Sequence, residues 1–115
     1  MATKKSNMAD LTSFTVAAGD TQVLLCPMRR KESDPYPIIN LAVFPQGAAS
    51  VVVEASLSSP SKIDANPDDT TVNWFPWANG PITSSSASKD DTLTGSVSAI
   101  RVKPTGGAAI VEARV

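Results

Sequence analysis

Histidine is absent from the 115 residues of the chain, and only one cysteine, Cys26, is present. The absence of histidine removes the commonest general base, the commonest zinc ligand and every catalytic arrangement that pairs histidine with serine or cysteine. A lone cysteine has no partner for a disulfide within the chain, and its position in the apolar run Val23-Leu24-Leu25-Cys26 favours a small buried side chain over a reactive thiol.

Charged residues make up only 18% of the sequence, aromatic residues make up 5%, and the formal net charge is -1. Because there is no broad basic field, we do not expect the chain to bind nucleic acid. No stretch approaches the roughly twenty apolar residues that cross a bilayer, and residues 1–10 lack the apolar core of a secretory signal. We therefore expect neither a membrane partner nor export. A surface of low charge, rich in hydroxyl groups, suits contacts with other proteins.

The length and the spacing of apolar residues predict one all-β domain. About seven or eight short runs rich in β-branched residues are separated by turn-like sequences, and no run of roughly ten residues has helical periodicity. This pattern predicts an antiparallel β-sandwich of the immunoglobulin-like or jelly-roll type. Residues 1–10 are polar and show no periodicity, so we expect an extended, flexible N-terminal arm ahead of a sandwich domain over residues 11–115.

Strict alternation of side chains predicts which face of two strands meets the core. The inward faces are expected to be Val51, Val53, Ala55 and Leu57 in one strand and Ala109, Val111, Ala113 and Val115 in the last strand. The neighbouring residues, among them Glu54 and Glu112, would then face away from the core.

Two turn-like sequences predict β-hairpins. Residues 17–20 would join the first pair of strands, and residues 104–107 would join the two strands of a closing hairpin over residues 92–115. Within that closing hairpin the apolar pattern changes face near Ser98-Ala99, which predicts a β-bulge at this position.

Acidic residues are the remaining candidates for chemistry. Paired carboxylates can hydrolyse glycosides, but most acidic residues here lie in turn-like sequences, where aspartate caps backbone N–H groups. The stretch from Asp64 to Asp69 places oxygen atoms at three positions of an EF-hand calcium loop, yet Asp69 replaces its glycine and Phe75 replaces its final glutamate. We therefore expect a polar surface loop and predict no enzyme activity, catalytic residue, metal or cofactor.

Three of the six aromatic residues lie in the sequence Trp74-Phe75-Pro76-Trp77. In one interpretation Trp74 continues the face of Val72 and fills the core, while Phe75 and Trp77 cover one end of the sandwich. In the other, Trp77 is exposed and stacks on a sugar or enters a pocket of a protein partner. The sequence does not choose between these two interpretations.

Two basic clusters are candidates for docking on an acidic partner, although solvated loops would have the same composition. Phosphate recognition normally uses a larger basic patch with interleaved aromatic residues, so nucleic acid is not the expected partner. Together with the exposed tryptophan, the candidate partner-binding residues are Lys4, Lys5, Arg29, Arg30, Lys31 and Trp77.

About the C-terminal two-fifths of the chain carries a more specific pattern. The tryptophan loop is followed by the stretch Asp91-Thr92-Leu93-Thr94-Gly95-Ser96-Val97-Ser98-Ala99-Ile100-Arg101-Val102 and then by the turn Gly106-Gly107. In this order of motifs the chain resembles small virion proteins of tailed bacteriophages and their prophages. The N-terminal half does not share the resemblance.

The resemblance implies a non-enzymatic β-sandwich that binds the capsid shell, the tail or a fibre, usually in several symmetric copies. We therefore expect a structural component of a tailed-phage virion, assembled in the host cytoplasm. A capsid decoration or head-fibre-anchoring protein is the first choice, with the major capsid protein or other virion subunits as partners and further copies of the chain in a homo-oligomer. The alternative is a carbohydrate-binding β-sandwich module that holds a glycan on an exposed tryptophan platform.

Overall fold

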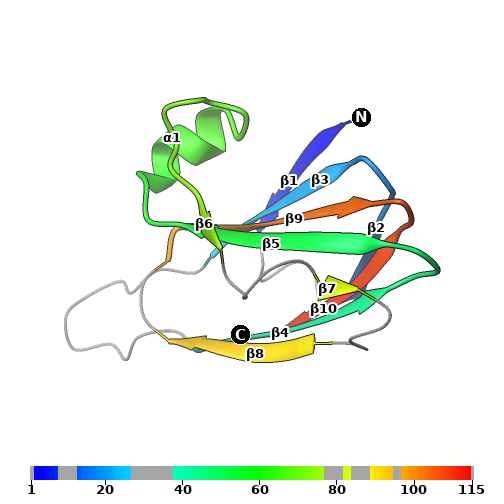
Figure 1. Cartoon of the computed structure of the whole chain (residues 1–115). Helices are drawn as coiled ribbons and strands as arrows, with labels where there is room; N and C mark the ends of the chain where they lie inside the picture. Colours follow the sequence, from blue (N-terminus) through cyan, green and yellow to red (C-terminus); the bar gives the residue numbers. More distant parts are fainter. Residues whose placement is uncertain are drawn as a thin grey trace.

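A computed structural model of the chain describes residues 2–7, 13–26, 38–76, 82–83, 89–94 and 97–114. These residues form two facing β-sheets (Figure 1), which confirms the predicted all-β sandwich. The elements in the described ranges are β1 (Thr3–Asn7), β2 (Ser13–Val16), β3 (Thr21–Leu25), β4 (Ile38–Pro45), β5 (Ser50–Ser56), α1 (Pro60–Ala65), β6 (Phe75–Pro76), β7 (Ile82–Thr83), β8 (Lys89–Thr94), β9 (Ala99–Thr105) and β10 (Ala109–Arg114).

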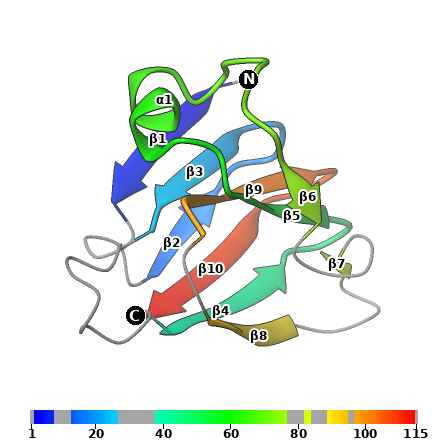
Figure 2. The same ribbon diagram turned by 90° about the vertical axis from the view of Figure 1, so that its left-hand side faces the viewer.

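The strands divide into two sheets, which we call sheet A and sheet B. Sheet A has the order β1-β3-β9-β5-β6, and β7 also pairs with β5. Sheet B has the order β2-β10-β4-β8. Among the described strands, β1 and β3 form a parallel pair and all other pairs are antiparallel (Figure 2).

The main core lies between the two sheets and uses the faces that alternation predicts. The buried residues of the two predicted faces are Val51, Val53, Ala55, Ala109, Val111 and Ala113. The prediction is wrong for Leu57, which is 67% exposed, because β5 ends at Ser56 and the alternation ends with it. Val115 lies outside the described residues.

Both predicted hairpins are wrong, because each turn carries the chain from one sheet to the other. Residues 17–20 connect β2 of sheet B to β3 of sheet A, and residues 106–108 connect β9 of sheet A to β10 of sheet B. Residues 46–49 form a third crossing, from β4 to β5. A hairpin and a crossing both place a glycine turn between two alternating runs, so the sequence pattern is the same for the two arrangements.

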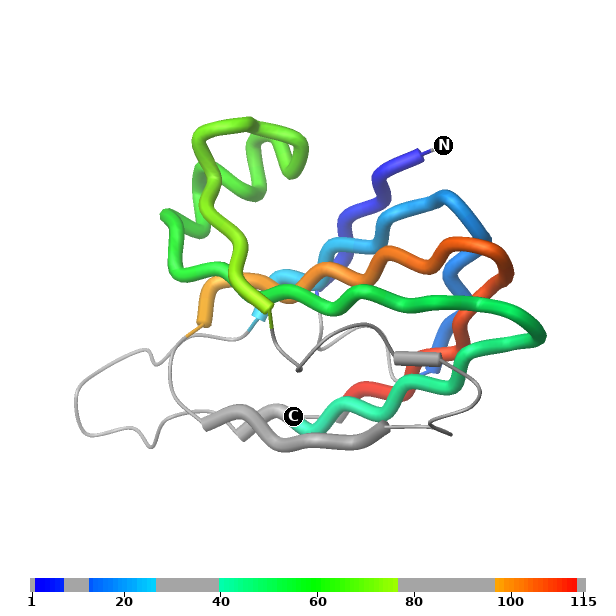
Figure 3. Tube along the Cα trace, in the orientation of Figure 1, coloured from blue at the N-terminus to red at the C-terminus, as the bar shows by residue number. Residues whose placement is uncertain are grey.

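The three crossings stack side by side and close one end of the sandwich, which we call the closed end (Figure 3). Gly19 N–H donates to the carbonyl of Pro104 at 2.9 Å, which joins the first crossing to the end of β9. Gln46 N–H donates to the carbonyl of Ala108, also at 2.9 Å, which joins the other two crossings. Each crossing contains one glycine with positive φ; these are Gly19 (83°), Gly47 (58°) and Gly106 (76°).

The predicted bulge at Ser98-Ala99 is also replaced by a change of sheet. Strand β8 ends at Thr94 in sheet B, and β9 begins at Ala99 in sheet A. Within β9, Ile100 packs into the main core, whereas Ala99 packs on the opposite face of sheet A. The change of apolar face in the sequence therefore marks the passage between sheets.

The outer face of sheet A carries a second apolar cluster under the short helix α1. Ile63 of α1 is fully buried there against Val23, Val72 and Ala99. The sequence did not predict this helix, since six residues are too few to show helical periodicity. Its one sequence signal is Pro60, because proline is favoured at the first position of a helix. No helix in the described part of the chain is long and apolar enough to cross a membrane.

The N-terminal segment is an edge strand where a flexible arm was expected. Residues Thr3–Asn7 form β1, in parallel register with Thr21–Leu25 of β3. Strand pairing uses backbone N–H and C=O groups, and every residue except proline supplies both, so a polar sequence can form a strand. The sequence of β1 is polar and has no apolar alternation, so no strand was expected there. Residues 8–12 lie outside the described ranges.

We predict that Gly107→Ala destabilises the closed end. A β-carbon at Gly107 would lie 2.5 Å from the carbonyl oxygen of Gln46, so the neighbouring crossing must shift. Urea unfolding should show a loss of about 1–3 kcal/mol in the free energy of unfolding. The control Ala48→Ser, at an exposed turn residue of the same end, should change it by less than about 0.5 kcal/mol. Equal stability of the two variants would contradict the close packing of the crossings.

Candidate functional site

The two lysines proposed from sequence lie on β1, at the edge of sheet A. Lys4 is exposed. The side chain of Lys5 turns to α1, where its Nζ lies 2.8 Å from Oδ1 of Asp64 and also donates to the backbone carbonyl of the same residue. Lys5 is therefore partly engaged within the chain, while Lys4 is exposed and has no ion pair with any other described residue.

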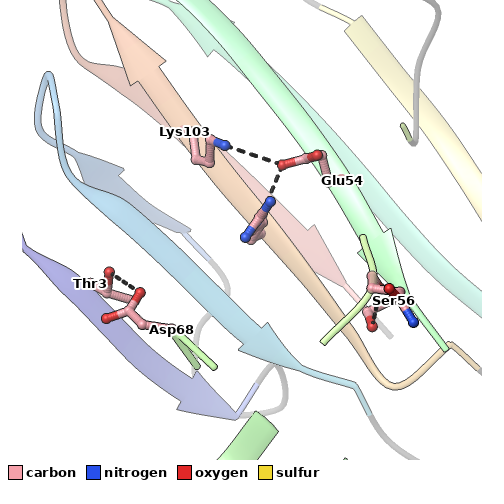
Figure 4. Close-up of polar contacts among 7 residues, drawn as sticks. Thr3, Glu54, Ser56, Asp68 and Lys103 are labelled. Atoms are coloured by element: carbon pink, nitrogen blue, oxygen red, sulfur yellow. Dashed lines mark hydrogen bonds and ion pairs between the residues drawn. The ribbon is translucent and has the colours of Figure 1, made fainter. Parts of the chain in front are cut away.

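Further polar contacts hold β1 on the molecule. Thr3 Oγ1 donates to Oδ1 of Asp68 at 2.8 Å, as Figure 4 shows. At the start of the strand, Ala2 N–H donates to Oδ1 of Asp20 at 3.0 Å, and Thr21 N–H donates to the carbonyl of Ala2 at 2.8 Å. The attachment of β1 thus depends on backbone pairing and polar side chains, in contrast to the apolar attachment of α1.

The other candidates from sequence, namely Arg29, Arg30, Lys31 and Trp77, lie outside the described residues. The described chain stops at Cys26 and resumes at Ile38 on either side of the basic loop, and it stops at Pro76 before Trp77. The structure therefore places Lys4 and Lys5 and leaves the other four as predictions.

Trp74 has a structural role in the described chain. Its side chain packs against the second apolar cluster on the outer face of sheet A. The guanidinium carbon of Arg101 lies 4.4 Å from the centroid of the Trp74 ring, a cation–π contact. Since one face of the ring is occupied by Arg101, Trp74 does not offer that face to a sugar. The neighbouring Phe75 is 41% exposed.

A charged network that no sequence pattern indicates joins β5 and β9, and Figure 4 shows Glu54 and Lys103 within it. Arg101 Nε donates to Oε1 of Glu54 at 2.7 Å, and Nζ of Lys103 lies 3.4 Å from the same oxygen. Glu54 and Arg101 are directly paired in the strand register. No sequence signal identifies this pair, since their contact depends on which two strands are neighbours and in which register.

Two effects compete for the ionisation of Glu54. Burial alone would raise the pKa of Glu54, but the hydrogen bond and charge of Arg101, together with the charge of Lys103, outweigh burial and hold the pKa below its usual value. The carboxylate is thus charged at neutral pH and holds Arg101 in place over Trp74.

The acidic loop after α1 uses its carboxylates within the chain. Asp64 pairs with Lys5, and Asp68 accepts from Thr3. Hydrogen bonds from the hydroxyl and backbone N–H of Thr71 lower the pKa of Asp69. Within the described ranges no group of three or more histidine, cysteine, aspartate or glutamate residues is placed to hold a metal ion.

Cys26 lies in the main core, as its apolar surroundings in the sequence predicted. It is 8% exposed, and burial raises the pKa of its thiol to about 12. The thiol is therefore protonated at neutral pH and packs as a small apolar side chain.

Comparisons with known proteins assign no family. No protein-family model matches the chain, and no curated protein matches its sequence. Among solved structures, the pre-peptidase C-terminal domain of collagenase from Bacillus anthracis superposes over 97% of this chain and 94% of that domain, with 7% sequence identity and a TM-score of 0.42. A likeness at this identity and TM-score carries no argument about function.

We predict that Glu54→Gln lowers the free energy of unfolding by about 1 kcal/mol at pH 7, the upper end for a partly exposed ion pair. The folded pKa of Glu54 is depressed, so its contribution is complete above the unfolded value of about 4.3 and is lost as the pH falls through the folded pKa. The difference in the free energy of unfolding between the Glu54→Gln variant and the unchanged protein should therefore disappear at acid pH. Urea unfolding at pH 7 and at acid pH measures both values.

The matched control is Glu112→Gln, which removes an exposed carboxylate from β10. It should leave the stability at pH 7 within about 0.5 kcal/mol of the unchanged protein. If Glu54→Gln behaves like this control at pH 7, the ion pair with Arg101 contributes nothing to folding.

Proposed function

We propose that the chain is a structural component of a tailed-phage virion, a capsid decoration or head-fibre-anchoring protein that binds the shell in several copies. The resemblance of the C-terminal part of the sequence to small phage virion proteins motivates this function. The observation that supports it in the folded chain is the difference between the outer faces of the two sheets.

The outer face of sheet B is open in the described part of the chain. Helix α1 lies on the outer side of sheet A, whereas no described helix or strand lies on the outer side of sheet B (Figures 1 and 2). We call this surface the open face. By strand alternation its residues on β2, β10 and β4 are Ser13, Thr15, Ile110, Glu112, Arg114, Ile38, Asn40, Ala42 and Phe44.

The chemistry of the open face suits a protein partner. Ile110 is directly paired with Thr15 on one side and Phe44 on the other, so half-buried apolar side chains lie in the middle of the face beside exposed hydroxyl groups. Among these residues only Glu112 and Arg114 are charged, and their charges are opposite. Burying such a surface costs little desolvation of charge, as is typical of the centre of protein interfaces. A shell subunit is the partner that the proposed function requires.

The carbohydrate-binding alternative receives less support from the folded chain. Its platform is an exposed tryptophan, and Arg101 covers one face of the ring of Trp74. The alternative then depends on Trp77. Specific glycan binding that Trp77→Ala abolishes without unfolding the protein would favour the alternative over the virion function.

The direct test is to purify phage or induced prophage particles from the strain that encodes the chain. Quantitative mass spectrometry should find the chain in several copies per particle, and its absence from purified particles would overturn the proposal. Because β1 belongs to sheet A, deletion of residues 1–10 would remove an edge strand and disturb the fold, so a point variant is the sharper probe.

We predict that Thr15→Lys, which places a charge on the open face, reduces the occupancy of the chain on particles. Burial of an unpaired lysine at an interface is costly, so a loss of tenfold or more is expected, corresponding to about 1.4 kcal/mol or above. The control Thr70→Lys adds the same charge at an exposed residue after α1 and should leave occupancy unchanged. Equal occupancy of the two variants would exclude the open face as the binding surface.

A further inference from the structure

Strands β1 and β8 form the edges at two diagonally opposite corners of the sandwich. The crossings of the closed end place β3 over β2, β9 over β10 and β5 over β4. Strand β1 lies beyond β3 in sheet A, and β8 lies beyond β4 on the opposite side in sheet B (Figure 2). Among the described residues neither strand has a partner on its outer side. An edge strand of this kind can offer its backbone N–H and C=O groups to another chain.

The two edges carry opposite charge. Strand β1 has the sequence Thr-Lys-Lys-Ser-Asn, with two positive charges and no acidic residue. Strand β8 has the sequence Lys-Asp-Asp-Thr-Leu-Thr, with a net charge of -1 from Lys89 against Asp90 and Asp91. Their lengths also match, with five residues in β1 and six in β8.

We propose that β1 of one copy of this chain pairs with β8 of the next copy, so that sheet A of one protomer continues into sheet B of its neighbour. Pairing of β1 with β1, or of β8 with β8, would bring like charges together, which is unfavourable between neighbouring strands. Pairing of β1 with β8 places Lys4 and Lys5 beside Asp90 and Asp91. The charges thus select the pairing of unlike edges and disfavour that of like edges.

The strand directions define the register of this pairing. Strand β1 runs parallel to β3, away from the closed end, and β8 runs antiparallel to β4, which leads toward the closed end. Both edges therefore run from the closed end to the other end of the sandwich. If neighbouring copies point their closed ends in the same direction, β1 and β8 pair in parallel, with Lys4 opposite Asp90 and Lys5 opposite Asp91.

Such a contact joins two different surfaces, so it is repeated at every copy and produces a ring or a filament. Lys4 is the lysine chosen to act across the contact, because it is exposed and has no ion pair within the described ranges, whereas Lys5 already pairs with Asp64. This contact specifies how copies of the chain meet, and it rests on the proposed function for its biological setting. Purified protein tests it separately from particle occupancy.

The experiment is sedimentation velocity of the full chain over a range of concentrations, at about 10 mM and about 1 M salt, where the Debye length is roughly 30 Å and 3 Å. We expect association at low salt that weakens at high salt. Lys4→Glu should raise the dissociation constant roughly fivefold, since an attractive cross-strand charge pair becomes repulsive. Adding Asp90→Lys to Lys4→Glu should restore association, because the pair is then reversed.

Two controls carry the same charge changes away from the edges. Lys62→Glu on α1 matches Lys4→Glu, and Glu112→Lys on the central strand β10 matches Asp90→Lys. Circular dichroism checks the fold, and Asp90→Lys alone tests the other edge independently of β1. A chain that stays monomeric at low salt, a Lys4→Glu variant that behaves like Lys62→Glu, or a double variant that is not restored would each overturn the proposal.

Discussion

The stacking of three chain crossings at the closed end is the constraint on which the rest of the structure depends. Two backbone hydrogen bonds, from Gly19 to Pro104 and from Gln46 to Ala108, hold the crossings side by side. Each crossing fixes where a strand of one sheet ends and where the next strand, in the other sheet, begins, so together they set the order of three strands in both sheets. Gly107 has no side chain to separate neighbouring crossings, and its place against the Gln46 carbonyl leaves no space for one.

The strand order set at the closed end decides what each surface of the molecule offers. It puts Glu54 beside Arg101 on the outer side of sheet A, where the ion pair and Trp74 extend the cluster under α1. In the part of the chain that the structure describes, no helix or strand covers the outer side of sheet B. The strand order also places the lysines of β1 and the aspartates of β8 at opposite corners, which is the geometry that a repeating assembly needs.

Alternation predicted the inward faces of β5 and β10 correctly, because a half-buried strand has a period of two wherever it lies in a sheet. It failed at Leu57, since the pattern continues one residue past the end of β5. It also mistook crossings for hairpins, because a glycine turn after an alternating run is common to both. Strand β1 and helix α1 escaped detection, the first because it pairs through its backbone and the second because it is too short.

The order of residues was sufficient for the all-β class and for the buried state of Cys26, because these depend on composition and on local periodicity. The tertiary structure decided which strands are neighbours, which turns cross between sheets, and that Lys5 meets Asp64 while Glu54 meets Arg101. The physical reason is that backbone hydrogen bonds are nearly the same for every residue, so a strand does not encode its partner. Only packing of the whole chain at the closed end selects one pairing among the many that the same alternation permits.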